Sequence, residues 1–214
     1  MLQDAGRKEA LVKGVVWIRP MEKMDGKQRR QWGQQWLYQA VAASGYPQVT
    51  AGMYPVLRTD KGKPYFAEEA GVYFSISHSK DYWACVVADE PVGMDLQFHK
   101  QGKLEQVSSR FFHPDEVAWL ETQTWPASFF EIWTAKESYV KWTGDGIDRH
   151  FGDFSVADET GLRDQIEGAY FWRSQVEAEY SLCLCGSQPW DEVSIMRWES
   201  GEDENWIMPD DGNC

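Results

Sequence analysis

The stretch FFEIWTAKESYVK, from Phe129 to Lys141, organises the fold of the chain. Its apolar residues Phe129, Trp133 and Val140 stand four and seven positions apart, which is the spacing of one helix face. The pattern predicts an amphipathic helix with that face in a hydrophobic core. Gly144 follows as a stop signal, because glycine readily adopts the conformation that ends a helix.

Glu137 and Lys141 lie on this predicted helix four residues apart, so their side chains project from the same side. Taken alone, the two residues fit an ordinary surface ion pair, worth roughly a few tenths of a kcal/mol. They also fit a charged site. The choice between these interpretations depends on what the rest of the chain brings to this helix face.

Composition favours a folded protein without a membrane segment. The 214 residues are 43% hydrophobic and include 12 Trp, 10 Phe and 9 Tyr, enough to bury a core in one large domain or in two smaller halves. No apolar run is long enough to span a membrane, and the first residues, MLQDAGRKEALVKG, lack the apolar stretch of a secretory signal. We therefore expect a cytoplasmic protein with no membrane partner.

The formal net charge of −13 argues against nucleic acid as a partner, because phosphate backbones need a basic footprint. An anionic ligand is compatible with this charge only if a local cluster of basic groups or a metal ion holds it. Any phosphate-binding site must therefore be local.

The order of predicted elements indicates an α+β fold. Three strands separated by short turns, at 72–76, 82–88 and 92–96, predict an antiparallel meander. The other expected elements are strands at 11–18, 150–157, 169–173, 178–185 and 192–198, a helix at 24–44 and two short helices within 103–121. This repetition suggests two similar α/β halves. We assign residues 1–98 to the first half, 99–199 to the second and 200–214 to an acidic, disordered tail.

The motif FSISHS, from Phe74 to Ser79, leads from a strand into a turn. Ser77 and His78 suggest a serine hydrolase in principle, but neighbouring residues of an extended chain point to opposite sides. That geometry spoils a pair of nucleophile and base. A hydrogen-bonded turn is the simpler interpretation of the motif on its own.

The motif VGMDLQ sets Asp95 in an otherwise apolar strand. Strand alternation places Gln97 on the same face, and Gly93 leaves space beside them. A carboxylate with an amide oxygen is a donor set that Mg²⁺ accepts, with waters and substrate phosphates completing its shell. The alternative is an aspartate that ends the strand and caps the next turn. If Asp95 and Glu137 converge, they form a metal site able to hold a pyrophosphate.

Five motifs, in their order and approximate spacing, resemble those of the surfactin-type 4′-phosphopantetheinyl transferases. They are GKP at Gly62–Pro64, FSISHS at Phe74–Ser79, VGMDLQ at Val92–Gln97, RFFHPDE at Arg110–Glu116 and WTAKESYVK at Trp133–Lys141. The resemblance covers roughly residues 60 to 156. Gly-x-Asp followed about 40 residues later by Trp-x-x-Lys-Glu-Ser-x-x-Lys is a specific combination, whereas either motif alone is weak.

The resemblance implies a pseudo-twofold protein in which each half is a small, mainly antiparallel sheet packed with a long helix. The active site would lie in the cleft between the halves and bind coenzyme A and Mg²⁺. Such enzymes move the 4′-phosphopantetheine arm from coenzyme A to a serine of an acyl or peptidyl carrier protein and release adenosine 3′,5′-bisphosphate. Because a fused pair of halves completes its own cleft, we expect a monomer.

The resemblance also assigns roles to individual residues. Asp95, Gln97 and Glu137 would form the metal site, with Gln97 standing where many relatives have a second acid. Glu137 would accept the proton of the carrier serine, and Lys141 would stabilise charge on the pyrophosphate. The positions that match the contacts to the 3′-phosphate end of coenzyme A are Lys63, Ser77 and His78, joined by Arg29 or Arg30.

Carrier docking needs a local patch, because the chain is strongly acidic and carrier proteins usually are as well. Phe111 and Phe112 are the candidates, and core packing is the other interpretation of both. Two other functions remain as alternatives. One is a coenzyme A-binding protein with weak or no catalysis, suggested by Gln97. The other is an aromatic-rich interaction module such as a carbohydrate binder, suggested only by the 12 Trp.

Overall fold

The computed structural model describes residues 12–21, 26–146 and 151–198. For residues 12 and 26–30 it describes the backbone alone. Its helices are α1 (Gly26–Ala43), α2 (Leu104–Phe111), α3 (Pro114–Leu120) and α4 (Ala127–Thr143). Its strands are β1 (Val12–Pro20), β2 (Leu57–Arg58), β3 (Pro64–Tyr65), β4 (Tyr73–Ser79), β5 (Tyr82–Ala88), β6 (Val92–Phe98), β7 (Ala157–Asp158), β8 (Gly161–Leu162), β9 (Gln165–Ile166), β10 (Ala169–Glu177), β11 (Tyr180–Gly186) and β12 (Trp190–Arg197). The described chain is thus a mixed α+β protein, as the sequence predicts.

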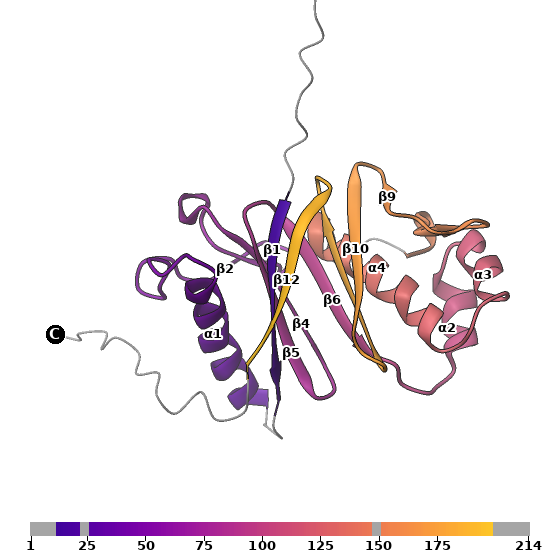
Figure 1. Ribbon diagram of the computed structural model, residues 1–214, viewed down its shortest axis with the longest axis horizontal. Helices are drawn as coiled ribbons and strands as arrows, with labels where there is room; N and C mark the ends of the chain where they lie inside the picture. Colours follow the sequence, from indigo (N-terminus) through magenta and orange to yellow (C-terminus); the bar gives the residue numbers. More distant parts are fainter. Residues whose placement is uncertain (1–11, 22–25, 147–150, 199–214) are drawn as a thin grey trace, which may run out of the picture.

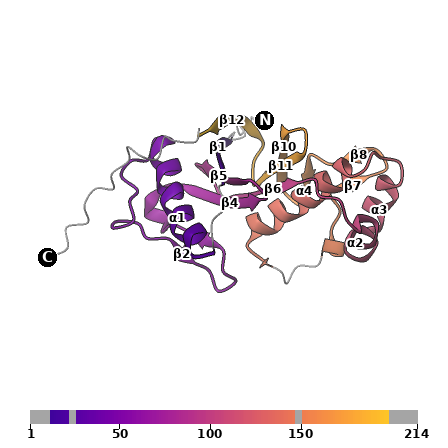
Figure 2. The ribbon, with the colours of Figure 1, turned by 90° about the horizontal axis from the view of Figure 1, so that it is seen from below.

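Two four-stranded sheets lie between two long helices (Figures 1 and 2). The first sheet has the order β12-β1-β5-β4 and the second β6-β11-β10-β9. Helix α1 covers the outer face of the first sheet and α4 that of the second, which gives the layers helix, sheet, sheet, helix (Figure 1). No helix among the described residues is long and apolar enough to cross a membrane.

Three apolar clusters hold these layers together. Between α1 and the first sheet lie Trp36 and Leu37 of the helix, both almost fully buried. Between the two sheets lie Ile18 of β1 and Leu182 of β11. The third cluster packs α4 against β10, β11 and the segment that carries Phe154. Most of the aromatic residues therefore have a packing role, which removes the main support for an interaction module.

Both long helices agree with the sequence patterns, and α4 ends as expected. Gly144 adopts a left-handed conformation with φ 76° and donates its N–H to the carbonyl of Val140. The expected break between two short helices is also found, between α2 and α3. There His113 and Glu116 form a reciprocal capping box at the start of α3.

The predicted meander is wrong at its third strand. Strands β4 and β5 pair antiparallel, but β6 pairs with β11 instead of joining them. The free edge of β5 is occupied by β1. A strand pattern specifies which residues face the core but not which neighbour the strand takes.

The strand predicted at 150–157 is also wrong where the structure describes it. Phe151–Asp153 form a single turn of 3₁₀ helix, and only Ala157 belongs to a strand. Phe151 and Phe154 pack against α4, which fixes a turn here instead of an extended chain. The residues of the predicted tail, 200–214, lie outside the described part.

The sheets do not follow the division at residue 98. Strand β6 precedes that point and pairs with β11, which follows it. Strand β12, near the end of the described chain, runs parallel to β1 at its beginning. The assignment of 1–98 and 99–199 to two halves stays a prediction.

Candidate active site

Gly93 allows α4 to lie directly on β6. A Cβ atom at this position would collide with the backbone of Ser138 and Trp142 in α4. The space that the sequence predicts beside Gly93 is thus occupied by the helix itself. Because Asp95 is two residues further along the same strand, this close approach brings Asp95 to the turn of α4 that carries Glu137 and Lys141.

Asp95 and Lys141 form the central ion pair of the site. The Lys141 ammonium donates to Asp95 Oδ1 at 2.7 Å. Ser77 Oγ lies 2.8 Å from the same oxygen. The Asp95 side chain is only 7% exposed, and its second oxygen, Oδ2, is buried without a hydrogen-bond partner among the described residues. Burying a carboxylate oxygen without a hydrogen bond raises the free energy of the folded protein unless a ligand binds that oxygen.

Glu137 completes the charged cluster. Burial raises the pKa of its carboxyl group, the negative charge of Asp95 raises it further, and the positive charge of Lys141 opposes both effects. A carboxylate with a raised pKa is a better proton acceptor near neutral pH than an ordinary surface glutamate. The structure therefore brings together three of the residues that the sequence singled out.

The donor set fits a hard cation. Asp95 Oδ2 lacks a partner within the described part of the chain, and Glu137 is close enough to be affected by the charge of Asp95. No group of three or more His, Cys, Asp or Glu residues that could hold a metal is found among the described residues. Two carboxylates suit Mg²⁺, which keeps several waters and takes other ligands from substrate phosphates. Gln97 lies half-buried on the same strand, and its part in such a site stays a prediction.

A cavity of about 610 Å³ opens beside this cluster. Its charged lining includes Lys61, Lys63, Glu137 and Lys141. The rest of its lining is largely apolar and includes Phe74, Ile76, Phe111, Trp133, Val140 and Phe151. The cavity lining thus combines charged groups with a larger apolar surface, a combination that suits a ligand with one charged and one uncharged part.

A second cavity, of about 630 Å³, lies between α1 and the first sheet. His78 lines it, together with Arg58 and residues of α1. Pro64 and Ile76 line both cavities, so the two adjoin. Ser77 and His78 face opposite sides of β4, as strand geometry predicts: Ser77 is buried, whereas His78 is exposed.

Lys63 lies at the junction of the hairpin β2–β3 with α4. Its ammonium donates to the carbonyl of Trp142 at 2.9 Å, and burial lowers its pKa. Arg29 and Arg30 belong to α1, but their side chains lie outside the described part. The phosphate contacts expected of these residues stay predictions. Arg58 is a further cation beside His78 that the sequence reasoning did not single out, although it lies close to the GKP motif.

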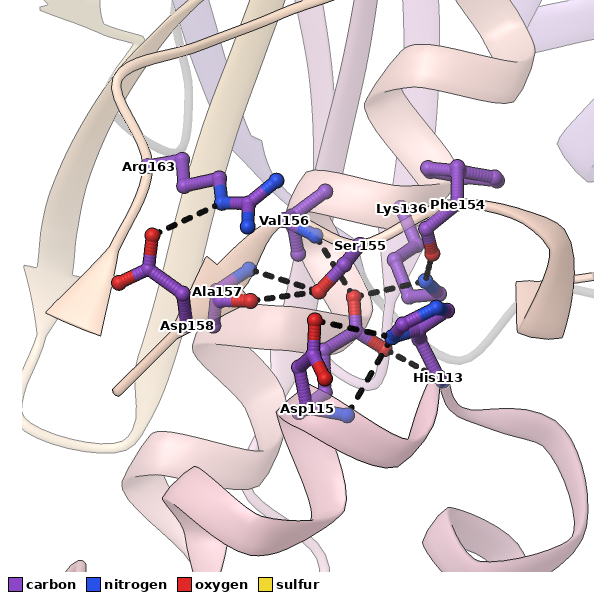
Figure 3. A network of polar contacts seen from close by, with 10 residues as sticks. His113, Asp115, Lys136, Phe154, Ser155, Val156, Ala157, Asp158 and Arg163 are labelled. Carbon is purple, nitrogen blue, oxygen red and sulfur yellow. Dashed lines mark hydrogen bonds and ion pairs between the residues drawn. The ribbon is translucent and has the colours of Figure 1, made fainter. Parts of the chain in front are cut away.

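A buried polar network around Lys136, the residue before Glu137 in α4, was also missed from the sequence (Figure 3). The ammonium of Lys136 donates to Glu116 Oε1 at 2.7 Å and to the carbonyl of Phe154 at 2.6 Å. The N–H of Val156 donates to Glu116 Oε1, and that of His113 donates to Oε2. Both charged side chains are fully buried. This network, centred on Glu116 and Lys136, joins α3, α4 and the segment after α4.

The two phenylalanines expected at a docking patch separate. Phe112 is 5% exposed and stacks on Phe129 in the core. Phe111 is 46% exposed and lines the first cavity. The guanidinium of Arg110 lies 5.2 Å from the centre of the Phe111 ring. Of these two rings, Phe111 is therefore the one accessible to a partner.

Comparisons with known proteins agree with this geometry. The model of the 4′-phosphopantetheinyl transferase superfamily matches residues 91–185, a range that contains Asp95, Glu137 and Lys141. A 4′-phosphopantetheinyl transferase of Bacillus subtilis is 31% identical over 137 residues, which are 60% of this chain and 61% of that protein. The 4′-phosphopantetheinyl transferase HetI of Nostoc sp. is 35% identical over 111 residues, 48% of this chain and 47% of that protein.

A third relative, the 4′-phosphopantetheinyl transferase gsp of Aneurinibacillus migulanus, is 34% identical over 93 residues. These residues are 42% of this chain and 38% of that protein. The chain therefore spans about three fifths or less of the length of these relatives.

Proposed function

We propose that the chain transfers the 4′-phosphopantetheine arm of coenzyme A to a carrier protein. The premise is that residues 91–185 match the model of the 4′-phosphopantetheinyl transferase superfamily and that the chain is a homologue of surfactin-type members. The acceptor is a serine of an acyl or peptidyl carrier protein. The second product is adenosine 3′,5′-bisphosphate. The observation that carries the proposal is the convergence of Asp95, Glu137 and Lys141 beside a cavity large enough for an extended ligand.

In this proposal Glu137 is the base. It accepts the proton of the carrier serine while the serine oxygen forms a bond to the phosphorus next to the pantetheine, and the bond to the bisphosphate breaks. Its raised pKa suits this task near neutral pH. Lys141 stabilises the negative charge that builds up on the leaving phosphate.

Asp95 and Glu137 would hold Mg²⁺, with Gln97 as a further oxygen donor. A bound Mg²⁺ would supply charge neutralisation at the pyrophosphate. Asp95 offers Oδ2 for this purpose because its Oδ1 is already bonded to Lys141 and Ser77. The ion pair with Lys141 can therefore persist when the metal is present.

The two adjoining cavities suggest how coenzyme A is placed. The first cavity, with its apolar wall, takes the pantetheine arm. The second takes the nucleotide end, where His78 and Arg58 lie near the 3′-phosphate. Arg29 and Arg30 are further cations for this end, and Lys63, which lines the first cavity beside Pro64, can reach the phosphates from that side. Pro64 and Ile76, which line both cavities, contact the middle part of coenzyme A in this arrangement.

We also propose the finer architecture that the resemblance implies. The first sheet with α1 and the second sheet with α4 are the two pseudo-twofold halves, and the active site lies between them. A carrier protein docks where Phe111 borders the first cavity with Arg110 beside its ring, because an apolar ring beside a cation suits an acidic helix. The protein acts as a monomer in the cytoplasm.

The test is the intact mass of an apo carrier protein after incubation with this protein, coenzyme A and Mg²⁺. We expect a gain of one phosphopantetheine group that requires Mg²⁺. The variant Glu137→Gln keeps the size of the side chain but cannot accept the proton, so we expect no gain with it. A gain that is independent of Glu137 would contradict the proposed mechanism.

A coenzyme A-binding protein with weak or no catalysis is the second candidate, and Gln97 is the observation that favours it. An amide in place of a second carboxylate weakens Mg²⁺ binding. Calorimetry would separate the two functions. Tight binding of coenzyme A without transfer to any of several carrier types would favour this candidate, and Gln97→Glu would then be expected to restore transfer.

A further inference from the structure

We propose that Ser77 is a positioning residue that orients the Asp95 carboxylate and does not hold the 3′-phosphate of coenzyme A. The inference rests on the proposed transferase function, since it concerns how the Mg²⁺ ligand Asp95 is held. It differs from the role that the family resemblance assigns to Ser77. The evidence is a row of serine hydroxyls between the two sheets.

Strand β4 touches β6 through serine side chains instead of backbone pairing. Ser75, Ser77 and Ser79 alternate along β4, and all three are buried. Their hydroxyl oxygens accept hydrogen bonds from β6. The donors are the backbone N–H groups of Met94 at 3.0 Å, Leu96 at 3.1 Å and Phe98 at 2.9 Å, in that order. These hydroxyls thus satisfy the edge of β6 that faces away from β11.

Ser77 differs from the other two serines in where its proton goes. A hydroxyl group has one proton to donate and two lone pairs. Since the N–H of Leu96 can only donate, Ser77 must accept from it. Its single proton is then directed to Asp95 Oδ1 at 2.8 Å, because the other acceptor in range, the carbonyl of Leu96, is 3.4 Å away.

This arrangement leaves the Ser77 hydroxyl unable to donate to a phosphate at the same time. Ionised phosphate oxygens accept hydrogen bonds, so they would need the proton that Ser77 gives to Asp95. The second group near Ser77 is the ammonium of Lys141 at 3.4 Å, which also only donates. The hydroxyl is therefore committed within the protein, whereas the neighbouring His78 is exposed and lines the second cavity.

The consequence for Asp95 is a fixed rotation of its carboxylate. Oδ1 is held by Ser77 and Lys141, and Oδ2 is left as the oxygen that a cation can take. Without the Ser77 hydroxyl the carboxylate can turn, and Oδ2 loses its defined direction. Groups that orient a metal ligand in this way typically change metal affinity by about 10- to 100-fold when they are removed.

The experiment compares Ser77→Ala with two matched variants. Ser79→Ala removes a hydroxyl of the same row that has no bond to Asp95, and His78→Ala removes the exposed neighbour. Two quantities are measured for each. The first is Mn²⁺ affinity in the presence of saturating coenzyme A, by titration calorimetry without carrier protein. The second is the ratio of the affinities for coenzyme A and 3′-dephospho-coenzyme A.

We expect Ser77→Ala to weaken Mn²⁺ binding by about 10- to 100-fold and to keep the wild-type ratio of the two coenzyme affinities. Ser79→Ala should keep both quantities, and His78→Ala should lower the ratio only. A lowered ratio with unchanged Mn²⁺ affinity in Ser77→Ala would overturn the inference. If Ser77→Ala does not fold, Ser77→Thr and Ser77→Cys take its place. We expect the Thr variant to keep the wild-type Mn²⁺ affinity and the Cys variant to bind Mn²⁺ more weakly. Equal Mn²⁺ affinities in these two variants would overturn the inference.

Failure of the proposed function looks different. A wild-type protein that binds coenzyme A and Mn²⁺ but modifies no carrier would refute the transferase activity, while the binding measurements would still decide the role of Ser77. The two hypotheses are thus tested by separate readouts.

Discussion

Helix α4 carries two lysines that form ion pairs of equal length but opposite character. Lys136 lies 2.7 Å from Glu116, and Lys141 lies 2.7 Å from Asp95. In the first pair both side chains are fully buried, and both Glu116 oxygens accept hydrogen bonds. In the second pair the lysine is 30% exposed and one carboxylate oxygen has no described partner. We infer that the closed pair holds the helix in place and the open pair is kept for a ligand.

The largest effect should come from breaking the closed pair. Lys136→Met leaves Glu116 as an uncompensated buried charge, so we expect a loss of about 3–5 kcal/mol in the free energy of unfolding. Urea denaturation measures this loss. Replacing both residues, Lys136→Met with Glu116→Leu, removes the unpaired charge but should recover only part of the loss, because the N–H groups of Val156 and His113 and the carbonyl of Phe154 lose their partners. If the single variant is as stable as the wild type, the network in Figure 3 is not what holds α4.

Phe112 and Phe111 extend the comparison to neighbouring residues. Phe112→Ala should destabilise the protein by about 3–5 kcal/mol, because it removes a core ring that stacks on Phe129. Phe111→Ala removes an exposed ring and should change stability by no more than about 0.5 kcal/mol. The second variant should instead raise the KM for the carrier protein. Equal stability losses in the two variants would contradict the assignment of Phe111 to docking.

Breaking the open pair should affect catalysis more than stability. We expect Lys141→Met to lower kcat by about 100- to 1000-fold, the size of effect seen when a charge-stabilising donor is lost. The free energy of unfolding should fall by about 1 kcal/mol, because the lysine is partly solvated and Ser77 still bonds to Asp95. A loss as large as that of Lys136→Met would mean that both pairs are structural.

The smallest effect expected is a gain in stability. Burial raises the pKa of Glu137 above 4.5, so its ionised form destabilises the folded state at neutral pH. Glu137→Gln removes this charge and should stabilise the fold by about 0.5–2 kcal/mol at pH 7. The gain should disappear as pH falls below the ordinary pKa of a glutamate, because both states of the wild type are then protonated. Thermal melts across pH 4 to 8 measure it, and a variant less stable at pH 7 would refute it.

Much of the site could be predicted from local patterns. The helical period places Glu137 and Lys141 on one face, and strand alternation separates Ser77 from His78. Both predictions depend only on residues that are close in sequence. The convergence of Asp95 with α4 depended on the family resemblance, because no local pattern tells which strand a helix covers.

The remaining features depend on contacts between distant segments. Glu116 and Lys136 are 20 residues apart, and the local pattern around each predicts a solvent-exposed charge on its own helix. The pairing of β6 with β11 follows from how the sheets meet, which strand patterns do not contain. The role of the serine row in β4 becomes visible only when the edge of β6 is seen beside it.

The most direct test of the open site uses Asp95→Asn in the carrier mass assay at increasing Mg²⁺ concentrations. The variant keeps the size of the side chain but removes the charge that holds Lys141 and the cation. We predict that the wild type converts the apo carrier to its phosphopantetheine form and that Asp95→Asn does not do so at the same Mg²⁺ concentration. Equal conversion by the two proteins would contradict the account.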